Sequence, residues 1–180
     1  MGQSKQISFR FIASRTMVAH TVTYCVVGLI AFALFDYAAL FEDPTLRAFL
    51  RQTDDPRVAA GVLFQPIRGF LFGIVFYLLR ESVFAKRNGW VTAWLMLVIV
   101  GVVSTFGPAP GSIEGFIYTK LPVVGHIGGM IEVLTQSLLL SVSTVYWVKR
   151  PHIKWLTWAL AILFVLALLL PSIGLVARLA

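Results

Sequence analysis

The segment FQPIRGF, residues 64–70, places Gln65 and Arg68 inside a run of otherwise apolar residues that is long enough to cross a membrane. An arginine near the centre of a bilayer costs about 2.5–3.5 kcal/mol on insertion scales. Its guanidinium is stabilised when a carboxylate or phosphate forms paired hydrogen bonds with it. The pattern therefore predicts an anionic partner for Arg68 within the membrane.

Glu132 is the first candidate for that partner. Arg68 follows the expected helix start at Val58 by ten residues, and Glu132 follows Pro122 by ten, which is about 15 Å of helix in each case. Equal depths predict that the two side chains face each other across the bundle as an intramembrane ion pair. Asp36, near the outer end of the first apolar run, is an alternative, as are water, lipid phosphate or a second subunit.

Further polar residues extend the predicted site. Small and polar residues recur along the helices that carry Arg68 and Glu132, so these two faces are expected to pack together. His126 and Glu114, toward the outer side, could form a proton-accepting pair. The predicted substrate-binding residues are Arg68, Glu132, Gln65, Gln136, Asp36, Glu114 and His126.

Pro66 affects the backbone beside Arg68. It has no N–H, so the carbonyl of Val62 loses its helical partner and the helix is expected to kink or break there. A second half-helix starting at about Ile67 would direct its positive end toward the same depth as Arg68. Discontinuous helices hold anionic groups in this way in transporters.

The histidines are too dispersed to bind a metal or haem. His126 is predicted in the outer leaflet, His20 near the cytoplasmic end of its helix and His152 in a cytoplasmic loop. Because no two share a depth, the sequence predicts no metal site and no cofactor. It also contains no nucleophile–base motif, so no catalytic residue is predicted.

Composition places the chain among membrane proteins. Of its 180 residues 58% are hydrophobic and 13% are charged, whereas soluble domains carry about 25% charged residues. The net charge is +7, but the basic residues form short clusters between apolar runs. This pattern is typical of topology signals and lipid headgroup contacts, so nucleic acid is not an expected partner. The lone Cys25 excludes an intramolecular disulfide.

The elements that must position these residues are five apolar runs, each read as a transmembrane helix. They cover residues 17–41, 58–79, 90–106, 123–148 and 153–176. Asp43 followed by Pro44 predicts a short amphipathic helix on the surface after the first run, with Leu46, Phe49 and Leu50 on its apolar side. Asp55 followed by Pro56 predicts the start of the helix of the second run. GPAPG closes the third run, and Ser112 is expected to cap a short helix over residues 113–121, in a re-entrant or interfacial segment. The fold class is an all-α membrane protein, with residues 1–180 forming a single integral membrane domain.

Lysine and arginine counts predict the orientation. With a cytoplasmic N-terminus, nine basic residues face the cytoplasm: Lys5, Arg10, Arg15, Arg80, Lys86, Arg87, Lys149, Arg150 and Lys154. Five face outward: Arg47, Arg51, Arg57, Lys120 and Arg178. The expectation is an N-terminus inside and a C-terminus outside, in the cytoplasmic (inner) membrane if the chain is bacterial.

Two functions fit this sequence. In the first, the protein handles or transports a small anionic or amphipathic substrate at the polar site around Arg68 and Glu132. In the second, that pair is structural, and the protein is a scaffold or accessory subunit of a membrane complex. An enzyme ranks below both. Expected partners are membrane lipids and, in either case, further copies of the chain or a larger complex.

Overall fold

The computed structural model describes residues 7–48 and 50–179, and within these ranges all regular elements are helical. The helices are α1 (Phe9–Leu34), α2 (Tyr37–Leu40), α3 (Pro44–Arg47), α4 (Pro56–Gly61), α5 (Gln65–Leu78), α6 (Arg80–Val83), α7 (Gly89–Val98), α8 (Ile113–Tyr118), α9 (Val123–Lys149) and α10 (Lys154–Leu179). A 3₁₀ turn over Val62–Phe64 joins α4 to α5, and a π-helical turn over Ile99–Val103 continues α7.

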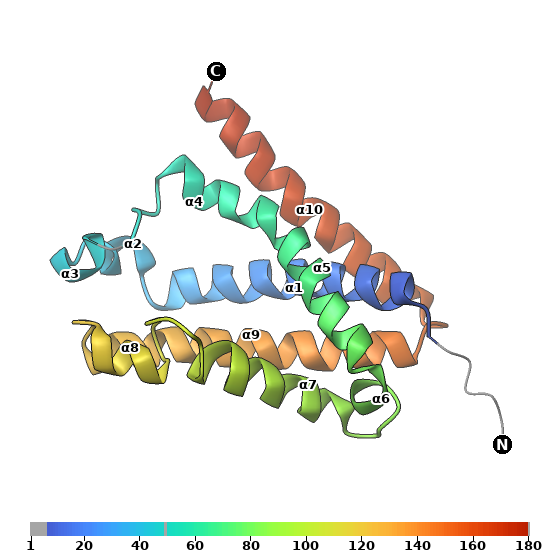
Figure 1. The fold of residues 1–180 in the computed structure, drawn as a ribbon. Coiled ribbons are helices and arrows are strands. Elements are labelled where there is room, and N and C mark those ends of the chain that lie inside the picture. The colour runs from blue at the N-terminus through green and yellow to red at the C-terminus, as the bar shows by residue number, and fades with distance from the viewer. Residues whose placement is uncertain (1–6, 49, 180) are drawn as a thin grey trace.

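Helix α1 lies at the centre of the bundle. It packs against α5, α9 and α10, while α7 packs against the far side of α9 (Figure 1). The chain through α4 and α5 crosses α1 obliquely, and the C-terminal end of α10 leans away from the other helices (Figure 1). Helix α1 thus presents different faces to several neighbouring helices.

Four helical stretches among the described residues are long and apolar enough to cross a membrane: Phe9–Leu34, Pro56–Leu78, Val123–Lys149 and Lys154–Ala177. A shorter apolar helix covers Gly89–Val103. The helical bundle, with helices long and apolar enough to cross a membrane, is therefore as the sequence predicts. The five predicted spans correspond to these four long stretches and the shorter helix.

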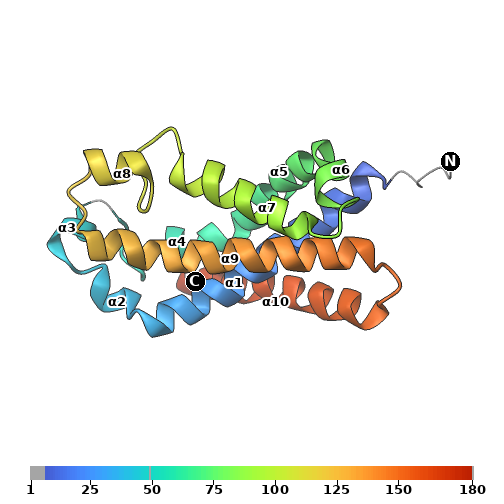
Figure 2. The same cartoon turned by 90° about the horizontal axis from the view of Figure 1, so that it is seen from below.

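The two ends of the bundle differ. The helices α2, α3 and α8 gather at one end, whereas α6 and the turn between α9 and α10 lie at the other (Figures 1 and 2). The main apolar core includes Ile12, Phe76, Leu140 and Val148. These residues all belong to the half of the bundle next to α6, so packing is tightest there.

Several predicted helix starts are confirmed. Asp55 caps α4 by accepting from the Arg57 N–H at 2.8 Å, and Ser112 caps α8 by accepting from the Gly115 N–H at 2.9 Å. Each side chain satisfies a backbone donor that the first helical turn leaves unpaired. Helix α3 begins at Pro44 as expected but has only four residues. Phe49, expected on its apolar side, and Lys5 of the orientation count lie outside the described residues.

The chain before Arg68 has a local irregularity, a 3₁₀ turn within the continuous helical stretch Pro56–Leu78. The Gln65 N–H donates to the Val62 carbonyl in the 3₁₀ turn, and Pro66 then lies in the first turn of α5. The Val62 carbonyl, which cannot accept a hydrogen bond from Pro66, thus accepts one from the N–H of Gln65 instead. Because a proline at a helix start leaves no hydrogen bond unmade, the chain can continue past it as α5.

The predicted bounds of the first span are wrong. Helix α1 starts at Phe9, eight residues before the expected Met17, and ends at Leu34, seven before Phe41. Ser8 caps it by accepting from the Phe11 N–H at 3.4 Å. At the other end Asp36 adopts a left-handed conformation, with φ of 45°, and caps α2. The prediction followed hydropathy alone and missed both signals.

The predicted packing of the two polar faces is also wrong, because α1 lies between them. A Cβ added at Gly69 would lie 2.8 Å from the Met17 Cα, and one at Gly73 would lie 2.7 Å from the Ala13 Cα. The glycines of α5 therefore allow close approach to α1 rather than to α9. On its own side, α9 also packs against α1.

Candidate functional site

A buried pair joins α1 to the start of α5. The Nε2 atom of His20 lies 3.1 Å from Oε1 of Gln65, and both side chains are buried. Gln65 reaches this position because the 3₁₀ turn ends there, and its Nε2 donates to the Gly61 carbonyl at 3.0 Å. With the amide N–H engaged by that carbonyl, the oxygen of Gln65 is the atom that faces the histidine.

This arrangement defines the tautomer of His20. An amide oxygen only accepts hydrogen bonds, so Nε2 of the imidazole carries the hydrogen and donates it. The other nitrogen, Nδ1, is then an acceptor. The Nδ1 atom has no hydrogen-bond partner among the described residues, and it is shielded from solvent because the His20 side chain is only 1% exposed. An unpaired buried acceptor is costly and often marks a site that another molecule completes.

Arg68 lies one turn beyond Gln65 on α5. Its guanidinium carbon is 5.7 Å from the ring centroid of Phe72, and the same ring meets His20 edge-on at 5.0 Å. The ring centroids of His20 and Tyr24 are 6.2 Å apart. The side chain of Arg68 is itself exposed. Arg68, His20 and Tyr24 thus form one polar cluster at about the middle of the Pro56–Leu78 stretch.

The predicted ion pair between Arg68 and Glu132 is not among the ion pairs of the described residues. Those pairs join Asp55 to Arg51 and Arg57, and Arg80 to Glu81. Glu132 instead accepts a hydrogen bond from the Tyr37 hydroxyl. Burial and this bond raise the pKa of Tyr37, so its phenol stays protonated and remains a donor.

The two charges lie at different heights along α1. Gly69, next to Arg68, faces Met17 and His20, whereas Glu132 faces Gly28, where its Oε1 would be 3.8 Å from an added Cβ. From His20 to Gly28 is eight residues, or about 12 Å of helix at 1.5 Å per residue. The depth estimate failed because it treated both helices as perpendicular to the membrane, whereas α5 crosses α1 obliquely (Figure 1).

The other predicted residues are spread along the bundle. Gln136 lies one turn beyond Glu132 on α9 and is half-buried, as is Glu114 on α8. Asp36 is exposed and accepts from the Ala39 N–H at 3.4 Å, so it serves as the cap of α2. The predicted residues therefore form two separate groups. Gln65 and Arg68 lie near His20 of α1, whereas Glu132 and Gln136 lie on α9, nearer the end of the bundle that carries α2 and α8.

His126 has a role that the sequence did not predict. Its Nδ1 accepts from the Gly111 N–H at 3.0 Å, its Nε2 lies 3.4 Å from the Thr119 hydroxyl, and its ring stacks on Phe116. These contacts attach the segment around α8 to the start of α9. They take the place of the predicted pair with Glu114 and leave both ring nitrogens occupied.

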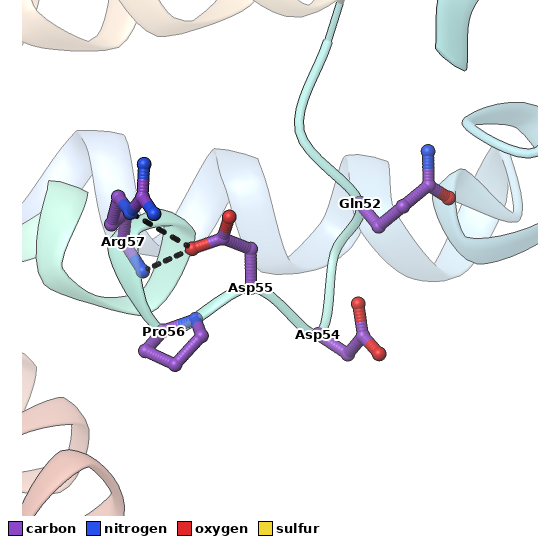
Figure 3. Close-up of a pocket in the computed structure, with 5 residues that line it drawn as sticks. All are labelled: Gln52, Asp54, Asp55, Pro56 and Arg57. Carbon is purple, nitrogen blue, oxygen red and sulfur yellow. Dashed lines mark hydrogen bonds and ion pairs between the residues drawn. The ribbon is translucent and has the colours of Figure 1, made fainter.

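A surface hollow of about 480 Å³ lies at the start of α4, lined by Gln52, Asp54, Asp55, Pro56 and Arg57. Figure 3 shows Arg57 folded back toward Asp55, with Gln52 and Asp54 directed away from that contact. Because the Asp55 carboxylate already caps the helix and pairs with arginines, this hollow is explained by the helix start.

Sequence reasoning missed His20, Tyr24 and Tyr37. His20 was placed near the end of its helix because the start at Phe9 was missed; in the structure it lies eleven residues into α1. Ser8 before Phe9 was the signal that could have located the start. The spacing of His20, Tyr24 and Gly28 at intervals of four then marks one side of the helix.

Comparison of the chain with protein-family models, with curated proteins and with solved structures finds no match. Within the described residues, no group of three or more His, Cys, Asp or Glu side chains could hold a metal ion.

Proposed function

We propose that this protein is an integral membrane protein that binds a small anionic or amphipathic substrate at Arg68. The observation that carries the proposal is the state of that arginine. It lies at about the middle of a helix apolar enough to cross a membrane, its side chain is exposed, and no described residue forms an ion pair with it.

Other arginines of the chain support this contrast. Arg15 donates to the Trp147 carbonyl and lies over the rings of Phe11 and Trp147. Arg150 donates to the Tyr146 hydroxyl at 2.8 Å. For Arg68, by contrast, the contact with the Phe72 ring is found without any hydrogen bond or ion pair to a described residue. Because an intramembrane cation is costly without a counter-charge, an anion from outside the chain would lower the free energy of this region.

The neighbouring groups assign roles in such binding. The planar guanidinium of Arg68 suits a carboxylate, phosphate or sulfonate. Glu132 and Gln136 lie further along, toward the end that carries α2 and α8, where Glu132 would balance the positive charge or relay a proton.

The second candidate function is that of a scaffold or accessory subunit. One observation favours it: Ile67 and Leu71, on either side of Arg68 along α5, are 59% and 55% exposed. A helix of a partner subunit could cover this face and supply a carboxylate to Arg68. The charge would then specify assembly instead of binding a substrate.

The proposal includes five crossings, with Gly89–Val103 as the shortest. It also places the N-terminus in the cytoplasm, the C-terminus outside and the protein in the cytoplasmic membrane, following the distribution of basic residues. Under this orientation α2, α3 and α8 lie on the outer side.

The test is binding of a probe whose negative charge does not change with pH: a spin-labelled dodecyl sulfonate. The protein is reconstituted in phosphatidylcholine nanodiscs, and the immobilised fraction of the probe is measured by electron paramagnetic resonance. Arg68→Gln should weaken binding at least about tenfold, since a hydrogen bond to a charged group contributes about 1.5–3 kcal/mol.

Two controls make the result specific. Arg87→Gln makes the same change in charge in the turn before α7 and should leave binding unchanged. A spin-labelled dodecanol should show no dependence on Arg68. Equal sulfonate binding by the unmodified protein and Arg68→Gln would exclude the proposal, and a change in subunit number by native mass spectrometry would favour the scaffold.

A further inference from the structure

A second cavity lies at the end of the bundle that carries α3 and α8, away from the Arg68 cluster. Its volume is about 500 Å³, within the usual range for small-molecule pockets. One wall comes from α3 and the residues after it, and the other from the segments on either side of α8. The lining residues are Pro44, Leu46, Ala48, Leu50, Pro108, Pro110, Thr119, Lys120 and Leu121.

The lining is almost entirely hydrocarbon. Its three prolines have no N–H to offer, and the leucine and alanine side chains make no hydrogen bonds. The Thr119 hydroxyl donates to the Gly115 carbonyl at 2.7 Å and accepts from the Leu121 N–H at 3.3 Å. With so few free polar groups in the lining, water can form few hydrogen bonds in this cavity, whereas an alkyl chain would be well accommodated.

One wall is held in place by polar contacts behind it. Ser112 binds the backbone of Ala109, donating to its carbonyl at 2.8 Å. His126, on α9, accepts from the Gly111 N–H at 3.0 Å and contacts Thr119. These contacts fix the segments that carry Pro110 and Lys120, so the wall is preorganised for binding.

Lys120 supplies the charge that selects the ligand. Its side chain is exposed, and no described residue forms an ion pair with it. A lysine beside an apolar cavity complements a molecule with a hydrocarbon tail and an anionic head, the arrangement by which basic residues bind acidic lipids at a membrane surface. The adjoining helices α1 and α9 belong to stretches long enough to cross a membrane, so lipid is the neighbour at hand.

We propose that this cavity binds one hydrocarbon chain of an anionic membrane lipid, with the lipid headgroup at Lys120. The proposal does not depend on substrate binding at Arg68, because it uses different residues and a different end of the molecule. It assigns to the paired segments around α3 and α8 the task of holding a lipid.

Native mass spectrometry tests the site. The protein is released from nanodiscs that contain equal amounts of phosphatidylglycerol and phosphatidylcholine. The unmodified protein should retain one lipid, with phosphatidylglycerol favoured roughly fivefold, as expected for one lysine near an anionic headgroup. Lys120→Gln should retain lipid without this preference. Ala48→Trp, which fills the cavity, should retain none.

Matched variants control for charge and bulk. Lys86→Gln makes the same charge change at the opposite end, and Ala38→Trp adds the same bulk on α2 outside the cavity; both should behave as the unmodified protein. Retention of lipid by folded Ala48→Trp, or loss of it in Ala38→Trp as well, would overturn the proposal.

A second measurement needs no variant. Phosphatidylglycerol with a photoreactive diazirine in its acyl chain is crosslinked to the unmodified protein, and the labelled peptides are identified. Labels should fall on residues 44–50 and 108–121. Labelling confined to the lipid-facing helices would overturn the proposal, even if Ala48→Trp fails to fold.

Discussion

Individual polar residues of this chain are satisfied by three different means. Glu132 receives a hydrogen bond from Tyr37, and His126 is held between Gly111 and Thr119. Asp55 binds backbone and arginines together. Against these, Arg68 is an exposed cation without an ion pair in the middle of a helical stretch long enough to cross a membrane, and the buried Nδ1 of His20, like the buried Thr144 hydroxyl, has no hydrogen-bond partner among the described residues. This contrast, more than the presence of an arginine, points to a site.

Asp55 makes a pH-dependent contribution to the start of α4. The backbone N–H of Arg57 and the neighbouring Arg51 and Arg57 side chains hold the pKa of Asp55 below its ordinary value. A carboxyl whose pKa is lower in the folded state stabilises that state above its unfolded-state pKa of about 3.9 and loses this effect as the pH falls. Asp55→Ala should therefore speed amide hydrogen exchange at Arg57 and Val58 near pH 7.

The same comparison at low pH tests the cause. As the pH falls through the folded-state pKa of Asp55, the difference in exchange between Asp55→Ala and the unmodified protein should be lost, because the carboxyl is then protonated in both states of the chain. Glu42→Ala, which removes an exposed carboxylate away from α4, serves as the control. A difference that persists unchanged at low pH would contradict the electrostatic part of the cap.

At the scale of elements, the contact between α1 and α5 depends on two glycines. An added Cβ at Gly69 or Gly73 would meet the backbone of α1 at 2.8 and 2.7 Å. Backbone cannot move aside as a flexible side chain can, so Gly69→Ala and Gly73→Ala should each destabilise the protein by about 1–3 kcal/mol. Thermal unfolding in detergent, followed by circular dichroism, measures this loss.

Gly61 provides a control on the same stretch of helix. An added Cβ there meets nothing within 4 Å, so Gly61→Ala should leave stability unchanged or raise it by up to about 1 kcal/mol, as expected for replacing a helical glycine. If Gly69→Ala is as stable as Gly61→Ala, α5 does not pack against α1 in this way.

Local signals in the sequence predicted more of this fold than distant contacts did. Asp55 with Pro56 and Ser112 marked helix starts correctly, because capping depends on neighbouring residues. The pairing of Arg68 with Glu132 depended on helix tilt and on which helix lies between them, and neither is written in local spacing. Because the start of α1 was predicted eight residues too late, His20 was assigned a different depth in the membrane from Gln65. The cluster of these two residues with Arg68 was therefore not predicted.

At the scale of the whole molecule, the bundle combines a packed half with a more open one. The apolar core joins α1, α5, α7 and α9 near α6. At the other end the helices separate, and the short segments around α3 and α8 lie beside them (Figure 2). Rigid packing at one end and the proposed lipid site at the other would suit a protein that receives a ligand from one side of the membrane.

The topology of the later part of the chain depends on whether the shortest apolar helix crosses the membrane. Gly89–Val103 has fifteen residues, about 22 Å of helix, against roughly 30 Å of hydrocarbon. Local thinning of the bilayer can accommodate such a deficit at modest cost, so we expect it to cross. In a Cys25→Ser background, Asn88→Cys and Gly107→Cys should then react with an impermeant maleimide from opposite sides.

Two further positions calibrate this assay. His152→Cys should react from the same side as Asn88→Cys, and Lys120→Cys from the same side as Gly107→Cys, because these residues share the two ends of the bundle. With a cytoplasmic N-terminus, the pair at Gly107 and Lys120 is the one labelled from outside. Labelling of Asn88→Cys and Gly107→Cys from one side would make Gly89–Val103 a re-entrant helix, and it would reverse the side from which a lipid could reach Lys120 relative to the N-terminus.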